Sequence, residues 1–531
     1  WSPLDLVPAA REAWAVLGDH TLYDELRQTA TATYYEDLTA LTDAISAAEP
    51  VPDVVALPIH GHLHDTPDHD ATDGPESDSE TTGHGSPVDA AHAVLEHTLV
   101  TLQTFLADDR LAGTRLLVLT HHAVAVTGND PIDLATAPVW GLVRSAQTEH
   151  PGRIHLIDHD HHPDSVTALA SAAATAHHHD EPHTALRSGT PHTPRLTPQT
   201  HQQNQPRAWN PDGTVLITGG LSGIGALLAH HLATTHHIRH LHLVGRRGHH
   251  TPGADTLIHD LTTAGAHVTI TATDITDPNA VHQLITSIPH DHPLTAVIHA
   301  AATTHDTPLQ TLTPDHLHPV LAPKIDGAHH LHHHTTHHNL AAFILFSSIS
   351  GLLGGAAQAN YAAANTFHDA LAHHRHTTGL PATSLAWGLW AHTSTLTTNL
   401  SQIDRKRLAR LGLHPLATAH ALALFDAVVF GPAGGPPVLV PARLNTATET
   451  PPPLLRRLIS PRRPAVRATR GAQAAGQDTS LAARLAGLAP DQRNHALLDL
   501  VRTEVATVLT HPNPTAIPTD RPLIELGLDS L

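Results

Sequence analysis

The chain contains no cysteine and no methionine, and aromatic residues make up only 3% of its 531 positions. Without cysteine, disulfides and thiolate metal sites are excluded. No run approaches about eighteen consecutive apolar residues, and no charged and apolar leader opens the chain, so we expect a soluble cytoplasmic protein without a membrane partner. The chain also starts at Trp1 and stops inside a motif, and we therefore expect an excised piece of a longer polypeptide.

Basic residues are scarce as well. Lysine and arginine together number 29, against 49 aspartates and glutamates, which gives a net charge of −20 with neutral histidine. Nonspecific binding to nucleic acid needs a concentrated basic face, so the charge balance argues against this class of partner.

Histidine is abundant instead, with 54 copies and its densest run at residues 329–338. The run invites a metal hypothesis. Imidazoles spread along one predicted helix, however, provide no defined tetrahedral set with supporting partners. Because histidine is enriched along the whole chain, we interpret the run as a surface composition bias and predict no metal site.

A nucleotide site is indicated by residues 214–225. The apolar run 214–218 predicts a short buried strand, which leads into a glycine-rich loop and then a helix over 224–235. Glycines at 219, 223 and 225 would let the backbone approach a pyrophosphate held at the start of that helix. A glycine cluster alone could also simply terminate a strand.

The segment after the loop distinguishes between two nucleotides. A second predicted strand, 240–244, is followed by Arg246 and Arg247, about twenty residues after the loop, where an NAD site usually carries an acid. A guanidinium can hold a ribose 2′-phosphate, so the sequence favours NADPH. Asp274 ends a third predicted strand and could accept from the adenine amino group, although it could equally cap a helix that begins near Thr276.

The residues for catalysis follow later in the chain. Ser348 ends the apolar run 343–348, and Tyr361 and Asn365 stand one helical turn apart on one predicted face. A hydroxyl at a strand end and a phenol on the following helix can both donate to one substrate oxygen. This arrangement is typical of carbonyl reduction.

Residues 214–391 resemble a short-chain dehydrogenase/reductase, and in particular the ketoreductase domain of a modular type I polyketide synthase. Members of that family carry a lysine, serine, tyrosine and asparagine, which Lys324, Ser348, Tyr361 and Asn365 match in order. In common short-chain dehydrogenases the lysine instead lies four residues after the tyrosine, at the position of Asn365 here. The exchanged positions favour the polyketide synthase branch.

The resemblance implies NADPH-dependent reduction of a β-ketoacyl chain, held as a thioester on an acyl carrier protein. Tyr361 would donate the proton, Ser348 would hold the same oxygen, Lys324 would lower the phenol pKa and Asn365 would order a proton relay. The alternative is a ketoreductase-like domain that is redox-silent and serves as scaffold or epimerase. The cofactor contacts implied by the resemblance are Thr218, Gly219, Leu221, Ser222, Gly223, Ile224, Gly225, Arg246, Arg247, Asp274, Ile275, Ala300, Ala301, Lys324, Tyr361, Trp387 and Gly388.

Stereochemistry is implied by fewer residues. A Leu-Asp-Asp motif marks B-type enzymes of the family, and this chain keeps only the second acid, Asp306. The tryptophan of A-type enzymes is replaced by Leu353, and Asn360 suits the B-type, so the resemblance implies a 3R hydroxyl. Ala302 stands where the family usually has glycine, and its methyl group could crowd the cofactor.

The implied fold is α/β, with two Rossmann-like subdomains. A truncated structural subdomain at 1–207, which lacks a glycine-rich loop, would brace a catalytic doubly wound parallel sheet at 208–447. Composition predicts a flexible insertion at 65–87 and a bridge between the halves at 178–207.

A linker at 448–485 would lead to a partial helical carrier domain at 486–531, whose Ser530 resembles the attachment site of 4′-phosphopantetheine. Neighbouring synthase domains are the expected partners. Full synthases of the family are dimers, whereas an excised piece can be a monomer. The sequence does not specify the substrate chain length or its α-substituent.

Overall fold

The computed structural model describes residues 1–9, 11–61, 86–199, 209–391, 408–409, 411–431, 435–445, 451–458, 490–508 and 518. The chain divides into two compact units, Trp1–Arg462 and Arg463–Leu531. In the second unit the described element is the helix α16, Pro490–Val508. Ser530, most of the predicted linker and residues 65–85 of the insertion predicted at 65–87 lie outside the described residues, whereas Ser86 and Pro87 belong to the start of α3.

The first half of unit one is built on an eight-stranded sheet in the order β1-β8-β7-β6-β5-β4-β2-β3. The strands from β3 to β7 pair in parallel, while β7, β8 and β1 pair antiparallel. The bounds are β1 Ser2–Pro3, β2 Ala13–Leu17, β3 Thr31–Tyr35, β4 Val54–Pro58, β5 Arg115–His121, β6 Ile154–His159, β7 His183–Arg187 and β8 Thr190–Thr193. The helices are α1 His20–Leu26, α2 Leu38–Ser46, α3 Pro87–Ala107, η1 Asp109–Leu111, α4 Ala137–Glu149 and α5 Pro163–His178.

The prediction of a bridge at 178–207 is wrong over much of its length. Residues 183–193 form a β-hairpin of the first sheet instead. Its turn places Ser188 and Gly189 at φ of 47° and 79°, the left-handed conformation that two-residue hairpin turns favour. Ala185 and Leu186 are fully buried, so the hairpin contributes to the core.

The second half is a seven-stranded parallel sheet in the order β11-β10-β9-β12-β13-β14-β16. This order confirms the expected doubly wound fold. The direction in which successive strands are added to the sheet reverses beside β9, and in folds of this kind ligands bind at the carboxyl ends of the strands next to that reversal. The bounds are β9 Thr214–Thr218, β10 His240–Gly245, β11 His267–Ala272, β12 Leu294–His299, β13 Ala342–Ser348, β14 Thr383–Trp387 and β16 Val438–Leu439. The short strands β15 Leu413–His414 and β17 Arg443–Leu444 form a separate antiparallel pair.

Helices connect these strands. Each residue of β9 is buried, as expected for a parallel strand covered on both faces. The bounds of the helices are α6 Gly223–Thr235, η2 Gly248–His250, α7 Ala254–Thr263, α8 Pro278–Thr286, η3 Leu309–Thr311, α9 Pro314–Leu321, α10 Asp326–Thr335, α11 Ser350–Leu353, α12 Ala359–Thr377, α14 Thr418–Val429 and η4 Pro453–Leu455. No helix among the described residues is long and apolar enough to cross a membrane.

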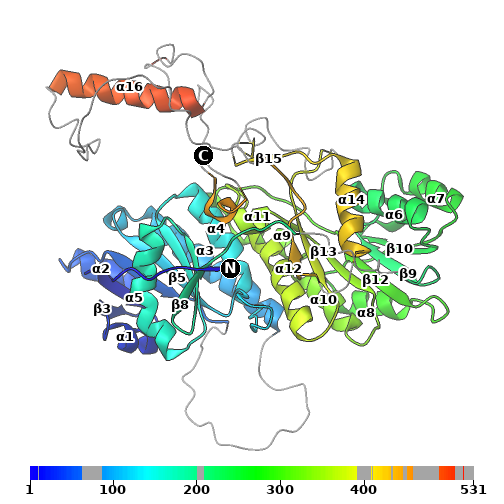
Figure 1. Cartoon of the computed structure of the whole chain (residues 1–531), viewed down its shortest axis with the longest axis horizontal. Helices are drawn as coiled ribbons and strands as arrows, with labels where there is room; N and C mark the ends of the chain where they lie inside the picture. Colours follow the sequence, from blue (N-terminus) through cyan, green and yellow to red (C-terminus); the bar gives the residue numbers. More distant parts are fainter. Residues whose placement is uncertain are drawn as a thin grey trace, which may run out of the picture. The chain divides into compact units, whose positions relative to one another are not determined.

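The two halves share one hydrophobic core, which contains Trp140 and Leu142 of α4 together with Ala363 and Phe367 of α12. Figure 1 shows the halves side by side, with α4 and α12 where they meet. The contact is close, because a Cβ added to Gly141 of α4 would lie 2.2 Å from the carbonyl oxygen of Ala362.

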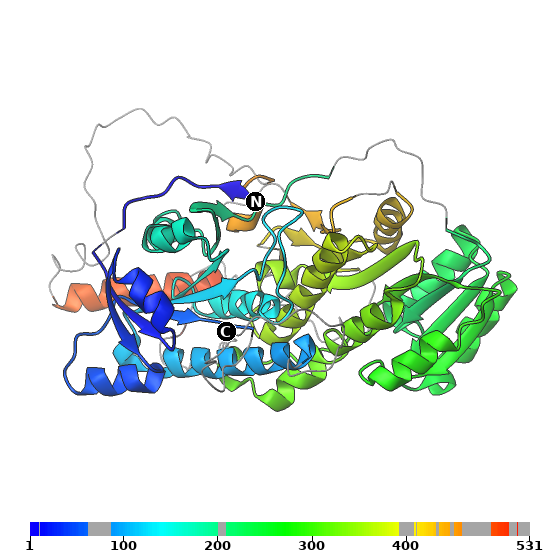
Figure 2. The ribbon, with the colours of Figure 1, turned by 90° about the horizontal axis from the view of Figure 1, so that it is seen from below.

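Polar contacts reinforce this interface. The Nη1 atom of Arg144 donates to the carbonyl oxygen of Gly351 at 2.6 Å, and Glu149 accepts from the backbone of Leu309 and Ala357 at 2.8 and 2.9 Å. The long helix α3 also runs beside the second half, where Gln103 donates to two carbonyl oxygens at 2.7 and 2.8 Å (Figure 2). The first half therefore positions α12, the helix that carries Tyr361.

Gly141→Ala tests this contact. The added methyl group would collide with the backbone of α12, and we expect the variant to lose about 1–3 kcal/mol of unfolding free energy. Gly113→Ala is the matched control, because nothing lies within 4 Å of its added Cβ, and its effect should stay within about 0.5 kcal/mol. Urea unfolding measures both, and equal midpoints for the two variants would contradict the close packing of α4 on α12.

Candidate active site

The structure brings Lys324, Ser348, Tyr361 and Asn365 together at one end of the second sheet. Ser348 is the last residue of β13, and Tyr361 and Asn365 lie on α12. Lys324 lies in the turn between α9 and α10, with its Nζ atom 5.8 Å from the centroid of the Tyr361 ring. Three residues from three different segments of the chain therefore lie around the phenol of Tyr361.

Burial controls the acid–base properties of this group. The pKa of Tyr361 is raised by burial, while the side chains of Asn365 and Ser348 act in the opposite direction by hydrogen bonding. Burial also lowers the pKa of Lys324 to about 7, and the negative charge of Asp369 opposes that shift. The lysine therefore changes charge near neutral pH, within reach of the phenol.

Hydrogen bonds fix the positions of these side chains. The Nζ atom of Lys324, whose residue is 2% exposed, donates to the carbonyl oxygen of Phe346 at 2.6 Å. Asn365 donates from Nδ2 to the carbonyl oxygen of Tyr361 at 2.7 Å. Its Oδ1 atom is buried without a hydrogen-bond partner among the described residues. This oxygen is thus available to accept from a water or a substrate group.

Ser348 is partly exposed and already engaged. Its Oγ atom accepts from the backbone nitrogen of Ser350 at 3.2 Å and shares a 2.9 Å hydrogen bond with the Ser350 hydroxyl. These contacts hold the hydroxyl in place at the end of β13.

The glycine-rich loop has the shape that a phosphate site requires. Gly219 has φ of 68°, and its amide donates to the carbonyl oxygen of Val244 at 2.8 Å. A Cβ added to Gly219 would lie 2.9 Å from the nitrogen of Ala301. A Cβ added to Gly225 would lie 2.2 Å from the carbonyl oxygen of Gly219. Ser222 is the N-cap of α6 and makes no side-chain capping bond, so amides at the start of this helix are available to an anion.

The neighbouring predicted contacts gather around the end of β9. Thr218 accepts from the backbone nitrogen of Ala300 at 3.1 Å, and its hydroxyl lies 2.7 Å from Nδ1 of His299. Leu221 is buried and Ile224 is partly buried against the same core. Gly223 has φ of 54°, a conformation that suits glycine.

Arg246 and Arg247 lie exposed just after β10, and among the described residues neither side chain has a hydrogen-bond or ion-pair partner. Asp274 is exposed and accepts from the nitrogen and hydroxyl of Thr276 at 3.1 and 2.9 Å. The N-cap of α8 is Asp277, not Asp274, so the capping alternative for Asp274 is wrong. Ile275 is buried, so its side chain belongs to the core.

Trp387 and Gly388 complete the predicted set beside Ser348. Trp387 pairs with Ser348 across β13 and β14, and its ring stacks on that of Phe346 with centroids 5.6 Å apart. Gly388 donates to the carbonyl oxygen of Pro441 at 3.0 Å. Residues 392–407, which follow this segment, lie outside the described residues.

The predicted stereochemical residues Asp306, Leu353 and Asn360 lie on three different segments, the loop after β12, α11 and α12. Asn360 is fully buried and donates to the carbonyl oxygens of His305 and His316, both at 2.9 Å, while its Oδ1 atom accepts from the nitrogen of Tyr361 at 2.8 Å. Asp306 is exposed and accepts from Gln358 at 3.2 Å, and Leu353 is half-buried on α11. Asn360 thus ties the loop that carries Asp306 to the catalytic helix.

The sequence analysis missed Asp369, Arg144 and His368. Burial raises the pKa of Asp369 to about 6, and the Ser384 hydroxyl donates to it at 2.5 Å. His368 contacts the carbonyl oxygen of Lys324 at 3.0 Å through Nε2. Asp369 lies one helical turn after Asn365, so its spacing on α12 was a usable signal. No sequence signal identified Arg144, because its partner Gly351 is 207 residues away.

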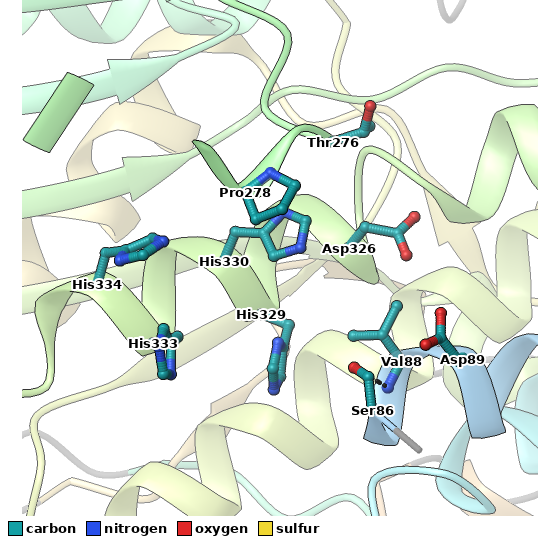
Figure 3. A pocket seen from close by; sticks show the side chains of 10 residues that line it. All are labelled: Ser86, Val88, Asp89, Thr276, Pro278, Asp326, His329, His330, His333 and His334. Atoms are coloured by element: carbon teal, nitrogen blue, oxygen red, sulfur yellow. Dashed lines mark hydrogen bonds between the residues drawn. The ribbon is translucent and has the colours of Figure 1, made fainter. Parts of the chain in front are cut away.

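A pocket of about 470 Å³ lies elsewhere, between the start of α3 and the helix α10 (Figure 3). None of the four predicted catalytic residues lines it. The histidine run of α10 contributes four side chains to its wall, and the full lining consists of Ser86, Val88, Asp89, Thr276, Pro278, Asp326, His329, His330, His333 and His334.

Comparisons with protein-family models divide the chain as the two sheets do. Residues 1–196 match the Rossmann-fold domain of the polyketide synthase extender module SpnB, and residues 213–392 match the KR domain. Neither match extends into the predicted carrier domain, which stays a sequence-based prediction.

Whole-chain comparisons agree. The chain is 42% identical over 540 residues to the spectinabilin polyketide synthase system protein NorA′ of Streptomyces orinoci, covering all of this chain and 14% of that protein. It is 39% identical over 542 residues to polyketide synthase GfsE of Streptomyces halstedii, covering all of this chain and 13% of that protein. The chain therefore spans only a small part of these relatives.

Solved structures show the same fold. An A-type ketoreductase from a modular polyketide synthase superposes with a TM-score of 0.69 at 28% identity, covering 86% of this chain and 96% of that one. With the parallel sheet, the glycine-rich loop and the two family matches in agreement, residues 213–392 are a KR domain of the modular polyketide synthase type, on the Rossmann fold of the short-chain dehydrogenases/reductases, and residues 1–196 are the Rossmann-fold domain that precedes it.

Proposed function

We propose that this chain reduces the β-keto group of an acyl thioester to a β-hydroxyl group with NADPH, during chain extension on a polyketide synthase. The observation that carries the proposal is the setting of Tyr361, a half-buried phenol that Ser348 and Asn365 flank, with the Nζ atom of Lys324 5.8 Å from the centroid of its ring. The substrate would be held on an acyl carrier protein, with neighbouring synthase domains as partners.

The chain's own residues would act on the carbonyl oxygen and its proton. Tyr361 donates its O–H to the β-carbonyl oxygen, and the Ser348 hydroxyl is a second donor to the same atom. Both donors strengthen their hydrogen bonds as negative charge develops on that oxygen, which lowers the barrier to reduction.

Lys324 and Asn365 support that proton transfer. A protonated ammonium near the phenol stabilises a phenolate, so Lys324 lowers the free energy of giving up the tyrosine proton. The unpartnered Oδ1 atom of Asn365 is positioned to hold a water that returns the proton. Because burial brings the pKa of Lys324 to about 7, the same side chain can also exchange protons near neutral pH.

The residues present fit a dinucleotide. A Cβ at Gly219 or Gly225 would collide with neighbouring backbone, so the tight turn of the loop requires glycine at both positions. The backbone amides at the start of α6, where Ser222 makes no side-chain capping bond, would bind the pyrophosphate. Arg246 and Arg247 would hold the 2′-phosphate of NADPH, which supplies the hydride when bound. Asp274, Ile275, Ala300, Ala301, Trp387 and Gly388 would line the remainder of the site.

We also propose B-type stereochemistry, with a 3R hydroxyl. The support is Asp306 on the loop that Asn360 ties to Tyr361, together with Leu353 in place of the A-type tryptophan. The carrier domain at 486–531, with 4′-phosphopantetheine on Ser530, and the boundaries at 207, 447 and 485 remain proposals from the sequence.

Tyr361→Phe tests the proposed function. Without the proton donor, the rate of NADPH oxidation with a β-ketoacyl N-acetylcysteamine thioester should fall about 10²- to 10⁴-fold, while NADPH binding, measured by nucleotide fluorescence, is retained. Tyr35→Phe is a matched control at a hydroxyl that contacts Glu49 in the first half, and it should keep the wild-type rate.

Two outcomes would count against parts of this proposal. A wild-type chain that binds NADPH without oxidising it would favour the scaffold or epimerase alternative, with Ala302→Gly as the first reversion to make. Chiral analysis of the product tests Asp306 as a stereochemical marker, since a 3S alcohol would exclude the B-type assignment.

The double substitution Arg246→Ala/Arg247→Ala tests the nucleotide preference. Loss of charge-assisted hydrogen bonds to the 2′-phosphate should raise KM for NADPH about 10- to 100-fold and leave KM for NADH nearly unchanged. Arg239→Ala, which removes an exposed pair with Asp212, should change neither value. An equal rise for both nucleotides would mean that these arginines do not recognise the phosphate.

Lys324→Met tests the buried ammonium through the pH dependence of stability. The folded-state pKa of Lys324 lies near 7, below its ordinary value of 10.5, so its contribution to stability is fully present only above that ordinary value and is lost progressively as pH falls from there to about 7. The variant should therefore gain stability relative to wild type on going from about pH 9.5 to about pH 6.5. Urea unfolding at both pH values measures this, and a difference independent of pH would refute it.

A further inference from the structure

A cluster of ligand-capable side chains lies away from the catalytic residues, where α6 meets α14. His231 on α6 and His236 at its C-cap both place Nε2 against Oδ1 of Asp426 on α14, at 2.8 and 2.7 Å. These three atoms all lie within 4.8 Å of one another. Two imidazoles and a carboxylate from two helices thus converge on one point.

We propose that His231, His236 and Asp426 bind a divalent transition-metal ion, with Zn²⁺ as the probe. Imidazole nitrogen is a ligand that zinc, nickel and copper prefer, whereas calcium and magnesium prefer all-oxygen sets. Three protein ligands leave the fourth tetrahedral position to water. The carboxylate now accepts two N–H donors, and an ion placed between the three groups would replace those hydrogen bonds.

The surroundings already hold both rings. The Nδ1 atom of His231 lies 3.2 Å from Oγ1 of Thr235, so when Nε2 binds the ion, an Nδ1–H can donate to that hydroxyl. This change moves one proton within the neutral ring and releases none. The ring of His236 stacks on that of Phe430, with centroids 3.8 Å apart and planes 14° from parallel.

Convergence on a shared carboxylate separates this cluster from the general excess of histidine, since other histidines of the chain, such as His299 and His368, are more deeply buried. The side chains of His231, His236 and Asp426 are 13%, 21% and 28% exposed. Among the described residues, the histidines of the run 329–338 belong to no comparable group of three ligand atoms, although several line the pocket in Figure 3. The cluster differs from that run because a second helix, α14, supplies the carboxylate of Asp426.

The position of the cluster gives the ion a structural effect. The helix α6 begins at the glycine-rich loop, and α14 comes between β15 and β16 in the chain. Binding an ion to the folded state would stabilise the contact between these two helices and raise the unfolding temperature. Acid would weaken binding, because each imidazole must be neutral to coordinate the ion.

The test compares Zn²⁺ binding to the full chain by isothermal titration and by thermal unfolding with and without Zn²⁺. We expect wild type to bind one equivalent that the double variant His231→Gln/His236→Gln binds more than about tenfold more weakly, together with loss of the zinc-dependent rise in unfolding temperature. The control His230→Gln/His259→Gln changes two exposed histidines on α6 and α7 and should retain both effects.

A single variant guards against misfolding. If the double variant fails to fold, His236→Gln alone should keep the metal-free unfolding temperature and lose the zinc-dependent rise. Cobalt provides an independent measurement, since a site with these ligands should give visible absorption bands with Co²⁺ that His236→Gln lacks. Equal zinc affinity and equal thermal shifts in wild type and in the His231 and His236 variants would overturn the proposal.

Discussion

The seating of α12 on α4 is the contact on which the active site depends. The catalytic helix lies against β13 and β14 within its own half, and against α4 of the first half. Gly141 provides the space for this approach, because a Cβ there would lie 2.2 Å from the Ala362 carbonyl oxygen. Gly354 does the same from the opposite side, since its added Cβ would lie 2.3 Å from the Arg144 carbonyl oxygen. Residues of both halves of unit one therefore position α12 and the phenol of Tyr361.

The same packing removes water from several charged groups. Burial lowers the pKa of Lys324 to about 7 and that of Arg144 to about 10, and it raises the pKa of Asp369 to about 6. Buried charges of this kind reduce stability unless they are paired, and sites that need a readily transferred proton commonly carry them. Here the positive charge of Lys324 and the negative charge of Asp369 favour each other's ionised form, so neither group can be altered without affecting the other.

Local signals in the sequence were sufficient to predict the strand and the helix of the proposed nucleotide site. The predicted strand 214–218 is β9, and the helix predicted over 224–235 starts one residue earlier, at Gly223. The hairpin at 183–193 could not be predicted because this segment is rich in histidine, threonine and proline. Its only two fully buried apolar residues, Ala185 and Leu186, are too few to give a strand pattern. Contacts between the halves could not be predicted, since the pairing of Arg144 with Gly351 follows from tertiary packing and leaves no periodic pattern.

The shared core has a consequence for the recombination of synthases. An exchange limited to the catalytic half would place foreign side chains of α12 against the native Gly141 and Arg144, and would cut through the core that contains Trp140 and Phe367. An exchange that carries both sheets together keeps both sides of that core from one parent. The natural unit for grafting this reductase into another assembly line is therefore the pair of halves, although only one of them contains the residues proposed for the chemistry.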